Sequence, residues 1–523
     1  MLFDKTLPQK SILILAVLLL LLLSGLMLIS IKNPPSLDDG LRHFAIAKEM
    51  RERGEYFGGV AWSDFFYEGY FAERAVDPWY LSNILYVPFS FLPPQVAVRA
   101  FSFTGIAALL ASFLWLLRPM KISAGWLALF SAILILGDRS FLFRIFLGRP
   151  FIIMTAVILL TVKGVLEKRA VLAAVCIFFA VLLSELYMFP LFIALLGSLW
   201  IWRAFGARSA VKMFSGVSAG ALAGLAAHPH AAEYISHTLG AFLKIPFSKG
   251  IKIGMEMYSG VFSVTSSTAL IGSAAMFAVF CIVFAPKADL RKWHREGVTF
   301  LAAITAVFYA FFFIWMRAID ILWPLEIVLL ALIIKCEPDK AFRLFAVSPF
   351  TSKYRNTTST SLSVNETAIL PFIAVLLAAV NYLSVFVSFR ASDESKSLSI
   401  FESLQTVPAG SKVLNLEWDI FPPLMAVRPD LKYATGIVST YTYLDDPKAY
   451  KLLRTAWPDP GEYDASLIDG GKWAEAILGR YPSDYLVLSK SRFPQFIYSL
   501  READVLKEMT ESGSEMAVFE VTQ

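Results

Sequence analysis

Long apolar segments recur along the whole of this 523-residue chain, and they constrain its fold more than any other feature. A helix needs roughly 20 apolar residues to cross a bilayer core. Segments near this length lie at residues 11–31, 95–117, 122–137, 146–162, 170–185, 186–202, 211–228, 261–285, 298–316, 318–335 and 368–388. The sequence therefore predicts a polytopic α-helical membrane protein with about 11 transmembrane helices.

Composition and charge narrow the class of protein further. Hydrophobic residues make up 57% of the chain and charged residues 17%, proportions that exclude an ordinary soluble domain. The net charge is only +5 and the basic residues lie in short turns between apolar segments, so we expect no nucleic-acid partner. The 3 cysteines suggest no disulfide framework.

The basic residues also predict the orientation in the membrane. Lys5 and Lys10 precede the first apolar segment, which is too long for a signal peptide, so we expect a retained first helix with a cytoplasmic N-terminus. If the segments alternate, the basic turns at residues 118–121, 163–169, 203–212, 287–295 and 335–355 all face the cytoplasm, as the positive-inside rule requires. This alternation depends on two helices within residues 170–202, divided at Glu185 and Pro190.

Two larger segments then fall on the outer side of the membrane. Residues 32–94 form a first outer loop within a transmembrane domain of residues 1–388, and residues 389–523 form a C-terminal extracytoplasmic domain. In the C-terminal domain, strand-like runs at 412–416, 485–488 and 516–521 alternate with helical patterns at 473–480 and 493–509. This pattern predicts a small α/β unit.

Paired carboxylates follow the first apolar segment. Asp38 and Asp39 stand at the start of a predicted helix, where Asp38 is four residues from Arg42 and Asp39 is four residues from His43. One interpretation is that both acids only complement the helix dipole and pair with these neighbours. At the outer membrane surface they are also placed to act as general base or metal ligand, together with Asp77 at the end of the same loop.

Arginines in the predicted outer turns run against the positive-inside tendency. The guanidinium fork suits phosphate oxygens, so these arginines indicate a bound anionic lipid headgroup. The alternative is pairing with a neighbouring acid, Asp138 or Asp320, or snorkelling at helix ends. The arginines concerned are Arg139, Arg144, Arg149 and Arg317.

A histidine-rich segment and a basic loop follow the seventh apolar segment. His230, Glu233 and His237 share one face if residues 231–238 are helical, and this spacing suits a divalent metal. Polar residues at a helix end in water would give the same pattern. Lys249, in the basic loop, is a candidate contact for a lipid-linked substrate.

Together, the acidic pair, the second acid, the outer arginines and the outer C-terminal domain resemble the GT-C superfamily of membrane glycosyltransferases, which includes protein mannosyltransferases and aminoarabinose transferases. The resemblance is greatest over residues 1–335. It lies in Leu37-Asp38-Asp39-Gly40, Asp77-Pro78-Trp79-Tyr80 and Arg149-Pro150-Phe151, and in the tail segments Glu417-Trp418-Asp419-Ile420-Phe421-Pro422 and Tyr433-Ala434-Thr435-Gly436-Ile437.

The resemblance implies an inverting hexosyl- or pentosyltransferase that moves a sugar from a polyprenyl-phosphate-type donor to a glycan, lipid or protein acceptor. Transfer would occur on the periplasmic face of a bacterial inner membrane. Asp38 or Asp39 would then be the catalytic carboxylate and Asp77 a second acid, while Arg149 and Arg317 would stabilise the departing lipid phosphate. The one cofactor suggested is a divalent metal, Mg or Mn.

This sequence also departs from the family pattern. It has Asp-Asp where the family most often has Asp-Glu, and it lacks the Trp-Trp-Asp signature, so transfer of a whole oligosaccharide to asparagine is not expected.

Two other classes of protein remain open. A transporter or flippase of lipid-linked glycans would need similar arginines, together with ionisable residues near the bilayer midplane and broken helices. The centres of the predicted spans look free of both. A binding or scaffold protein would keep the fold without catalysis, and the acids at 38, 39 and 77 argue against it.

Overall fold

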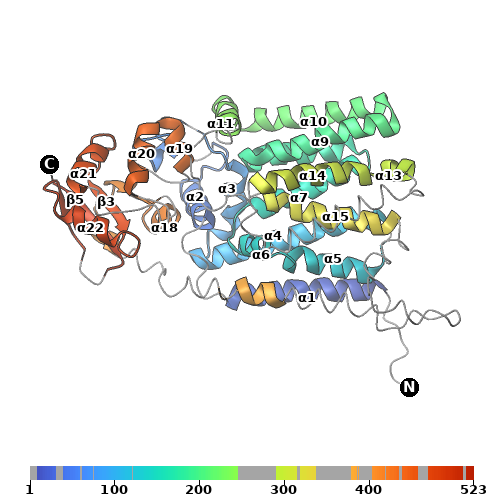
Figure 1. The fold of residues 1–523 in the computed structure, drawn as a ribbon, viewed down its shortest axis with the longest axis horizontal. Helices are drawn as coiled ribbons and strands as arrows, with labels where there is room; N and C mark the ends of the chain where they lie inside the picture. Colours follow the sequence, from blue (N-terminus) through green and yellow to red (C-terminus); the bar gives the residue numbers. More distant parts are fainter. Residues whose placement is uncertain are drawn as a thin grey trace, which may run out of the picture.

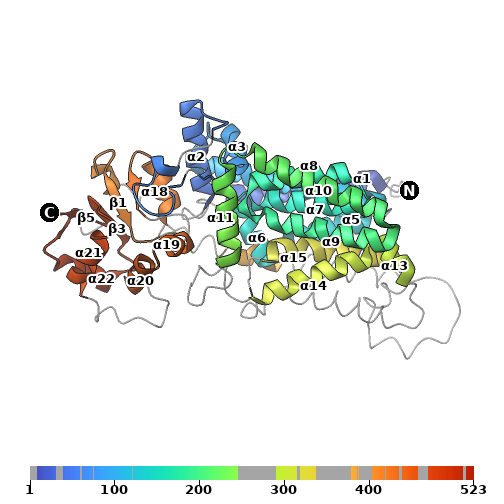
Figure 2. The same cartoon turned by 90° about the horizontal axis from the view of Figure 1, so that it is seen from above.

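Long helices packed side by side form the larger part of the molecule in this computed structural model, and a small sheet with its own helices lies at one end of them (Figures 1 and 2). The structure describes residues 9–30, 39–58, 62–74, 76–120, 122–244, 290–314, 318–336, 379–385, 387, 403–417, 420–434, 439–456, 469–510 and 514–522. We call the end of the helix bundle nearest the sheet the sheet end. There α4, α7, α9 and α15 begin, and α8, α10 and α14 finish.

The long helices agree closely with the apolar segments. They are α1 (Gln9–Ser30), α4 (Pro94–Leu117), α5 (Ala124–Leu136), α7 (Phe151–Leu166), α8 (Ala170–Leu183), α9 (Met188–Phe205), α10 (Ala207–Ala227), α14 (Val298–Ile314) and α15 (Ile319–Cys336). Many of their large apolar side chains are exposed, including Leu15, Leu199 and Leu222. An apolar outer surface of this kind suits contact with lipid.

Fewer helices than the expected eleven meet the length and composition required of a membrane span. Within the described residues, three helices are long and apolar enough to cross a membrane, or four if the bent pair of α5 and α6 counts as one span. Shorter apolar helices include those at Leu13–Ile29, Phe151–Leu166, Ala170–Leu183 and Val298–Phe312. The expected span at 261–285 and most of that at 368–388 lie outside the described residues. The helical membrane architecture is thus supported, whereas the count of eleven spans is not established.

The expected turn between the third and fourth spans contains a further helix. α6 (Arg139–Phe146) leaves α5 at an angle of 73° and begins where Asp138 accepts a hydrogen bond, 2.8 Å long, from the Phe141 N–H. An aspartate at this position supplies an acceptor that the first turn of a helix lacks. The last carbonyls of α5 are likewise satisfied, since Trp323 and Asn381 donate to them.

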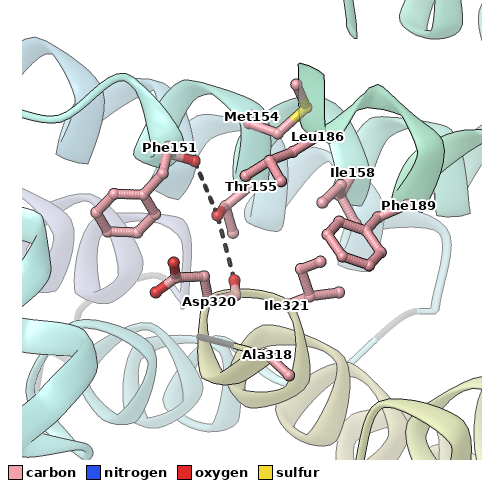
Figure 3. A pocket seen from close by; sticks show the side chains of 9 residues that line it. All are labelled: Phe151, Met154, Thr155, Ile158, Leu186, Phe189, Ala318, Asp320 and Ile321. Atoms are coloured by element: carbon pink, nitrogen blue, oxygen red, sulfur yellow. Dashed lines mark hydrogen bonds between the residues drawn. The ribbon is translucent and has the colours of Figure 1, made fainter. Parts of the chain in front are cut away.

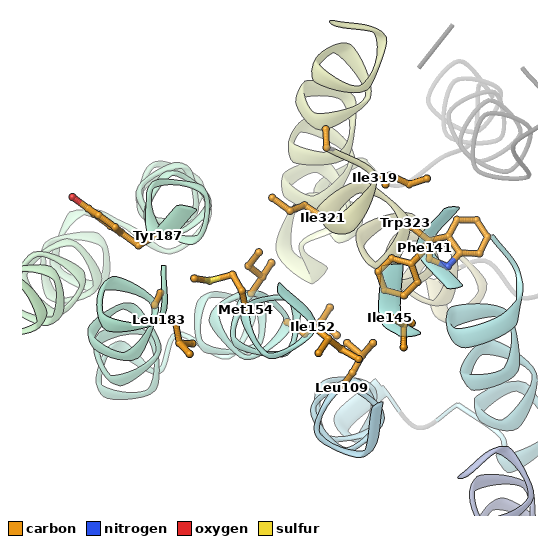
Figure 4. Close-up of a cluster of buried hydrophobic side chains, with 14 of the residues drawn as sticks. Leu109, Phe141, Ile145, Ile152, Met154, Leu183, Tyr187, Ile319, Ile321 and Trp323 are labelled. Carbon is orange, nitrogen blue, oxygen red and sulfur yellow. The ribbon is translucent and has the colours of Figure 1, made fainter. Parts of the chain in front are cut away.

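Between α1 and α4 lies the first loop, with α2 (Asp39–Arg53), η1 (Trp62–Asp64), α3 (Tyr80–Tyr86) and η2 (Val87–Phe89). The remaining bundle elements are η3 (Arg118–Met120), η4 (Glu185–Tyr187), α11 (Ala231–Lys244) and α13 (Leu290–Glu296). Side chains of α4, α6, α7, α8 and α15 meet in the buried cluster drawn in Figure 4. This packing fixes the sheet end of the helices relative to one another.

α10 lies directly against α8. Gly216, Gly220 and Gly224 face α8, and a Cβ added to Gly220 would lie 2.2 Å from the carbonyl oxygen of Ala174. Small residues four apart let two helix backbones approach closely, as in many membrane proteins.

The C-terminal residues form a mixed five-stranded sheet in the order β2-β1-β3-β5-β4. β1 (Lys412–Asn415) is parallel to β2 (Lys432–Tyr433) and β3 (Tyr485–Ser489), and β5 (Met516–Val521) is antiparallel to β3 and β4 (Leu506–Glu508). Its helices are α18 (Phe421–Val427), α19 (Ser439–Asp445), α20 (Pro447–Ala456), α21 (Gly470–Leu478) and α22 (Pro494–Arg501). The three expected strands are present, whereas the expected helix at 493–509 ends early and its last residues form β4.

Candidate active site

Polar side chains from separate segments of the chain meet at the sheet end. α2 begins at Asp39, so Asp39, Arg42 and His43 lie one turn apart on the same face of that helix. Gly40 lets this face approach the residues before α7, because a Cβ there would lie 2.6 Å from the carbonyl oxygen of Leu147. The Asp-Gly pair thus places the start of α2 beside Arg149.

Asp39 lies between two guanidinium groups. Its Oδ1 is 3.1 Å from Arg42 Nη1, and its Oδ2 is 4.0 Å from Arg149 Nε. The Arg42 side chain is 1% exposed, and those of Arg149 and Asp39 are 15% and 23% exposed. Two guanidinium groups thus face this carboxylate from different sides.

A chain of hydrogen bonds leads from Arg42 to Asp77. Arg42 Nη2 lies 3.5 Å from His43 Nε2, His43 Nδ1 lies 2.6 Å from Asn83 Oδ1, and Asn83 Nδ2 donates to both oxygens of Asp77 at 2.8 and 3.1 Å. Burial and the Arg42 charge lower the pKa of His43 to about 3. The imidazole is therefore neutral, and we assign it the tautomer that donates to Asn83 and accepts from Arg42.

Asp77 is buried at the other end of this chain. Its Oδ1 accepts the Trp79 N–H at 3.1 Å, and its carbonyl oxygen accepts from His228 Nε2 at 3.0 Å. Burial raises the pKa of the Asp77 carboxyl, although the hydrogen bonds from Asn83 and Trp79 oppose this shift. The two carboxyl groups therefore differ, since Asp39 is partly exposed and faces positive charge, while Asp77 is enclosed.

Arg144 is held by an acid from a distant helix. Its Nε and Nη2 donate to the two oxygens of Asp320, both at 2.8 Å, in a buried fork. The expected pairing of Asp320 with Arg317 is not described, because Arg317 lies outside the described residues. Arg139 is exposed at the start of α6, where Asp138 caps the helix.

An apolar pocket opens beside this ion pair (Figure 3). It contains about 390 Å³ of empty space, including its open side. Thr155 Oγ1 lies between the carbonyl oxygens of Phe151 and Asp320, at 3.0 and 3.2 Å, so its hydroxyl is already engaged. The lining residues are Phe151, Met154, Thr155, Ile158, Leu186, Phe189, Ala318, Asp320 and Ile321.

A second polar cluster joins the bundle to the C-terminal sheet unit. Glu185 accepts hydrogen bonds from Tyr441 of α19, at 3.0 Å to each oxygen, and lies 2.9 Å from Nε2 of His237. Nδ1 of His237 lies 2.9 Å from the hydroxyl of Tyr70 in the first loop. Burial, together with the neighbouring Glu185, raises the pKa of Tyr441, so this hydroxyl acts as a donor.

The residues proposed as a metal site are not arranged as one. Both ring nitrogens of His237 are engaged, and the His230 N–H donates to His228. Across the part of the chain that the structure describes, no group of three or more His, Cys, Asp or Glu side chains is placed to hold a metal ion. His237 bonds to Tyr70 and Glu185, so the geometry of these side chains lends no support to the expected ligand set of His230, Glu233 and His237.

The structure brings together some of the expected site residues and adds others. Asp39 and Arg149 adjoin, and Asp77 joins them through Asn83 and His43, whereas Asp38, Arg317 and Lys249 lie outside the described residues. Arg42 pairs with Asp39, three residues away, and His43 bonds to Asn83. The sequence analysis assigned no site role to Arg42, His43, Asn83, Trp79 or Glu185.

No protein-family model matches this sequence, and no curated protein is similar to it in sequence. Solved structures are similar in fold. The Archaeoglobus fulgidus oligosaccharyltransferase tethered to an acceptor peptide has a TM-score of 0.56 at 12% identity, over 97% of this chain and 74% of its own. The A. fulgidus enzyme AglB, in complex with an inhibitory peptide and a dolichol-phosphate, has a TM-score of 0.56 at 11% identity, over the same shares of the two chains.

The arabinofuranosyltransferase AftD from Mycobacteria has a TM-score of 0.52 at 12% identity, over 99% of this chain and 40% of its own length. The chain therefore spans less than half of AftD. These neighbours have the GT-C fold, and the likeness shows that this chain has it too.

Proposed function

We propose that this chain, with its GT-C fold, is a membrane glycosyltransferase that moves a sugar from a polyprenyl-phosphate-type donor to an acceptor hydroxyl. The observation that carries the proposal is the position of Asp39 between Arg42 and Arg149. A carboxylate and paired guanidinium groups at the end of apolar helices suit a substrate that is anionic at one end and lipid at the other. The dolichol-phosphate named with one archaeal neighbour and the acceptor peptide named with the other fit this kind of substrate pair.

In the proposed reaction, the acceptor oxygen attacks the anomeric carbon of the sugar while its proton passes to Asp39. The bond between that carbon and the phosphate oxygen breaks, and its electron pair stays on the lipid phosphate. Attack from the face opposite the phosphate inverts the configuration. Arg149 stabilises the negative charge that grows on the leaving phosphate. Asp38, Arg317 and Lys249 remain candidates for contacts in the same site.

Asp77 supports this chemistry indirectly, through a chain of hydrogen bonds. Its carboxyl fixes Asn83, Asn83 fixes the ring of His43, and His43 accepts from Arg42, so Asp77 orients the face that carries Asp39. No step of the proposed reaction requires a divalent metal, and Asp38, the expected acidic ligand of such a metal, lies outside the described residues. Asp77 is thus a positioning acid in this proposal.

The apolar pocket beside Arg144 and Asp320 is a suitable place for the first part of the lipid chain. Burial of apolar surface stabilises binding by about 25 cal/mol per Å². In the proposal, the bundle is the transmembrane domain of residues 1–388, with a cytoplasmic N-terminus. Residues 389–523 are a periplasmic domain over the site, in a bacterial inner membrane.

The experiment is sugar transfer by the purified protein in liposomes that contain polyprenyl-phosphate-linked sugars. We expect Asp39→Asn to lower the rate by at least about 100-fold, since a general base contributes 10²–10⁴-fold, and Asp77→Asn to lower it less. Lys48→Gln, a change on α2 at a half-exposed side chain, is the matched control and should keep the wild-type rate. Full activity in Asp39→Asn and in Asp38→Asn would remove the proposed base.

A flippase of lipid-linked glycans is the second candidate, because of one observation that corrects the sequence analysis. Glu326, near the middle of α15, is fully buried, and neither of its carboxylate oxygens has a hydrogen-bond partner among the described residues. Pro324 lies in the same helix. The centre of this predicted span therefore does carry an ionisable residue, of the kind that marks transport pathways.

The same liposomes separate the two functions. A glycosyltransferase forms a new glycosidic bond and leaves Glu326→Gln active, whereas a flippase moves the donor lipid between leaflets without bond formation and loses this movement in Glu326→Gln.

A further inference from the structure

The Arg42 side chain has hydrogen-bond donors that its surroundings do not satisfy. Its side chain is buried, yet neither Nε nor Nη1 has a hydrogen-bond partner among the described residues. The 3.1 Å approach of Nη1 to Asp39 is an ion pair without hydrogen-bond geometry. A buried donor left unpaired costs about 1–3 kcal/mol, so such donors in a native site require an explanation.

The Arg42 guanidinium is nevertheless held firmly in place. Its central carbon lies 4.2 Å from the centre of the Trp79 ring, a cation–π contact, and Nη2 faces His43. On the far side of Asp39 stands Arg149. One carboxylate therefore has a guanidinium group near each of its oxygens, which leaves this group of three with one excess positive charge.

Arg144, the other buried arginine nearby, differs in this respect. Two of its nitrogens donate to Asp320 in a fork with both bonds at 2.8 Å. An anion would have to break that fork in order to use it. At Arg42 an anion would displace the Asp39 carboxylate from Nη1, but it would break no hydrogen bond of Nε or Nη1.

We infer that Arg42 and Arg149 together bind one phosphate group of the lipid-linked substrate, and that Asp39 is the resting counter-ion which this phosphate displaces. The inference rests on the proposed function and deepens it. No covalent bond changes in this step, because one anion takes the place of another beside the two guanidinium groups. The displaced Asp39 carboxylate is then available to the acceptor hydroxyl, so donor binding prepares the base.

The test is binding of polyprenyl monophosphate, which carries no sugar, to the full-length protein in nanodiscs. We expect Arg42→Gln to weaken binding by at least about tenfold, since hydrogen bonds to charged groups contribute about 1.5–3 kcal/mol. Arg149→Gln should weaken binding by a similar factor. Because Arg149 is more exposed than Arg42, this second variant tests the inference even if Arg42→Gln does not fold. Asp39→Asn should instead tighten binding several-fold, because it removes the competing negative charge.

Lys48→Gln is the control on the same helix and should bind within about twofold of wild type. A structural role of Arg42 and Asp39 would weaken binding in both variants, so the opposite signs identify exchange of counter-ions. Equal binding by Arg42→Gln and wild type, or weaker binding by Asp39→Asn, would overturn the inference and leave the proposed function standing.

Two further ligands identify the source of the phosphate. Inorganic phosphate should bind at least about 100-fold more weakly than polyprenyl phosphate, because it buries no apolar chain. Equal affinities would overturn the lipid source. Polyprenol without phosphate should bind weakly and equally to wild type and Arg42→Gln, and a failure of the wild-type protein to bind polyprenyl phosphate at all would count against the proposed function itself.

Discussion

At the scale of single residues, the site depends on side chains that keep a fixed charge or a fixed neutrality. His43 is the clearest case, because a protonated ring would place a second cation against Arg42 and lose an acceptor. Its neutral ring lets one hydrogen-bond chain join Asp77 to the arginine beside Asp39.

The first prediction concerns pH. The pKa of His43 is about 3 in the folded protein and near 6.5 in an unfolded chain, so only the unfolded chain takes up this proton between those values. Stability is therefore complete above pH 6.5 and is lost as the pH falls towards 3, by about 2 kcal/mol between pH 7 and pH 5. Melting temperatures of the wild type and of His43→Gln at both pH values measure this contribution.

On acidification, the melting temperature of the His43→Gln variant should fall less than that of the wild type. It should not become independent of pH, because burial also lowers the pKa of His228, to about 4. Identical pH dependence in the two proteins would show that His43 does not lie in a buried neutral state.

The second prediction concerns the Arg144–Asp320 pair. Arg144→Ala should destabilise the protein by about 3–5 kcal/mol because it leaves a buried carboxylate unpaired. Replacing both partners with Met and Leu should recover most of the loss. The exposed pair of Arg169 and Glu167 provides the control, and Arg169→Ala should cost under about 1 kcal/mol. A double replacement as unstable as Arg144→Ala would contradict this reasoning.

Sequence reasoning found the acids and one arginine of the site and missed their partners for a physical reason. Asp39, Asp77 and Arg149 are recognisable because charged residues flank apolar segments. Asn83 and Trp79 carry no charge, and their part in the site depends on how α3 folds against α2. Arg42 is recognisable as a neighbour of the acidic pair, but the lack of hydrogen-bond partners for its Nε and Nη1 among the described residues depends on long-range packing.

At the scale of elements, the apolar runs located the helices, while helix ends and bends needed local chemistry. The Asp138 cap gave a possible signal for α6, because aspartate followed by a polar first turn favours a helix start. Residues 493–509 read as one helix, yet α22 ends at Arg501 and the chain turns into β4, which the edge of an existing sheet stabilises. Such a long-range contact has no local signature.

The third prediction tests the contact of α10 with α8. Gly220→Ala should destabilise the pair by about 1–3 kcal/mol, because the added methyl group meets the main chain of Ala174 and the helices must separate. Gly125→Ala is the matched control, since a Cβ there meets nothing within 4 Å, and it should be neutral or slightly stabilising. Thermal unfolding in detergent measures both, and equal effects would refute the close approach.

At the scale of the whole molecule, the C-terminal sheet unit and the bundle are joined through the first loop. The Tyr433 N–H donates to the Phe65 carbonyl at 2.7 Å, the rings of Phe66 and Phe421 lie 5.1 Å apart, and Tyr441 donates to Glu185. The sequence predicted both parts but not this joint, since tyrosines and phenylalanines are common in any core.

The fourth prediction concerns that joint. Tyr441→Phe removes both hydrogen bonds to Glu185 without changing the apolar ring, so amide hydrogens of α19 and α11 should exchange faster, by about tenfold. Tyr443→Phe, on the same helix, should leave exchange unchanged. Unaltered exchange in Tyr441→Phe would show that other contacts hold the two parts together.

The joint between the first loop and the sheet also has a consequence for the order of assembly. Lys432 donates to the carbonyl of Asp64, which lies 368 positions earlier in the chain. At about 5–20 residues per second, a ribosome needs roughly 20–70 s to add this stretch. The loop that carries Asp77 is thus synthesised well before the strand that it packs against, so maturation of the site has to wait until the sheet unit has been made.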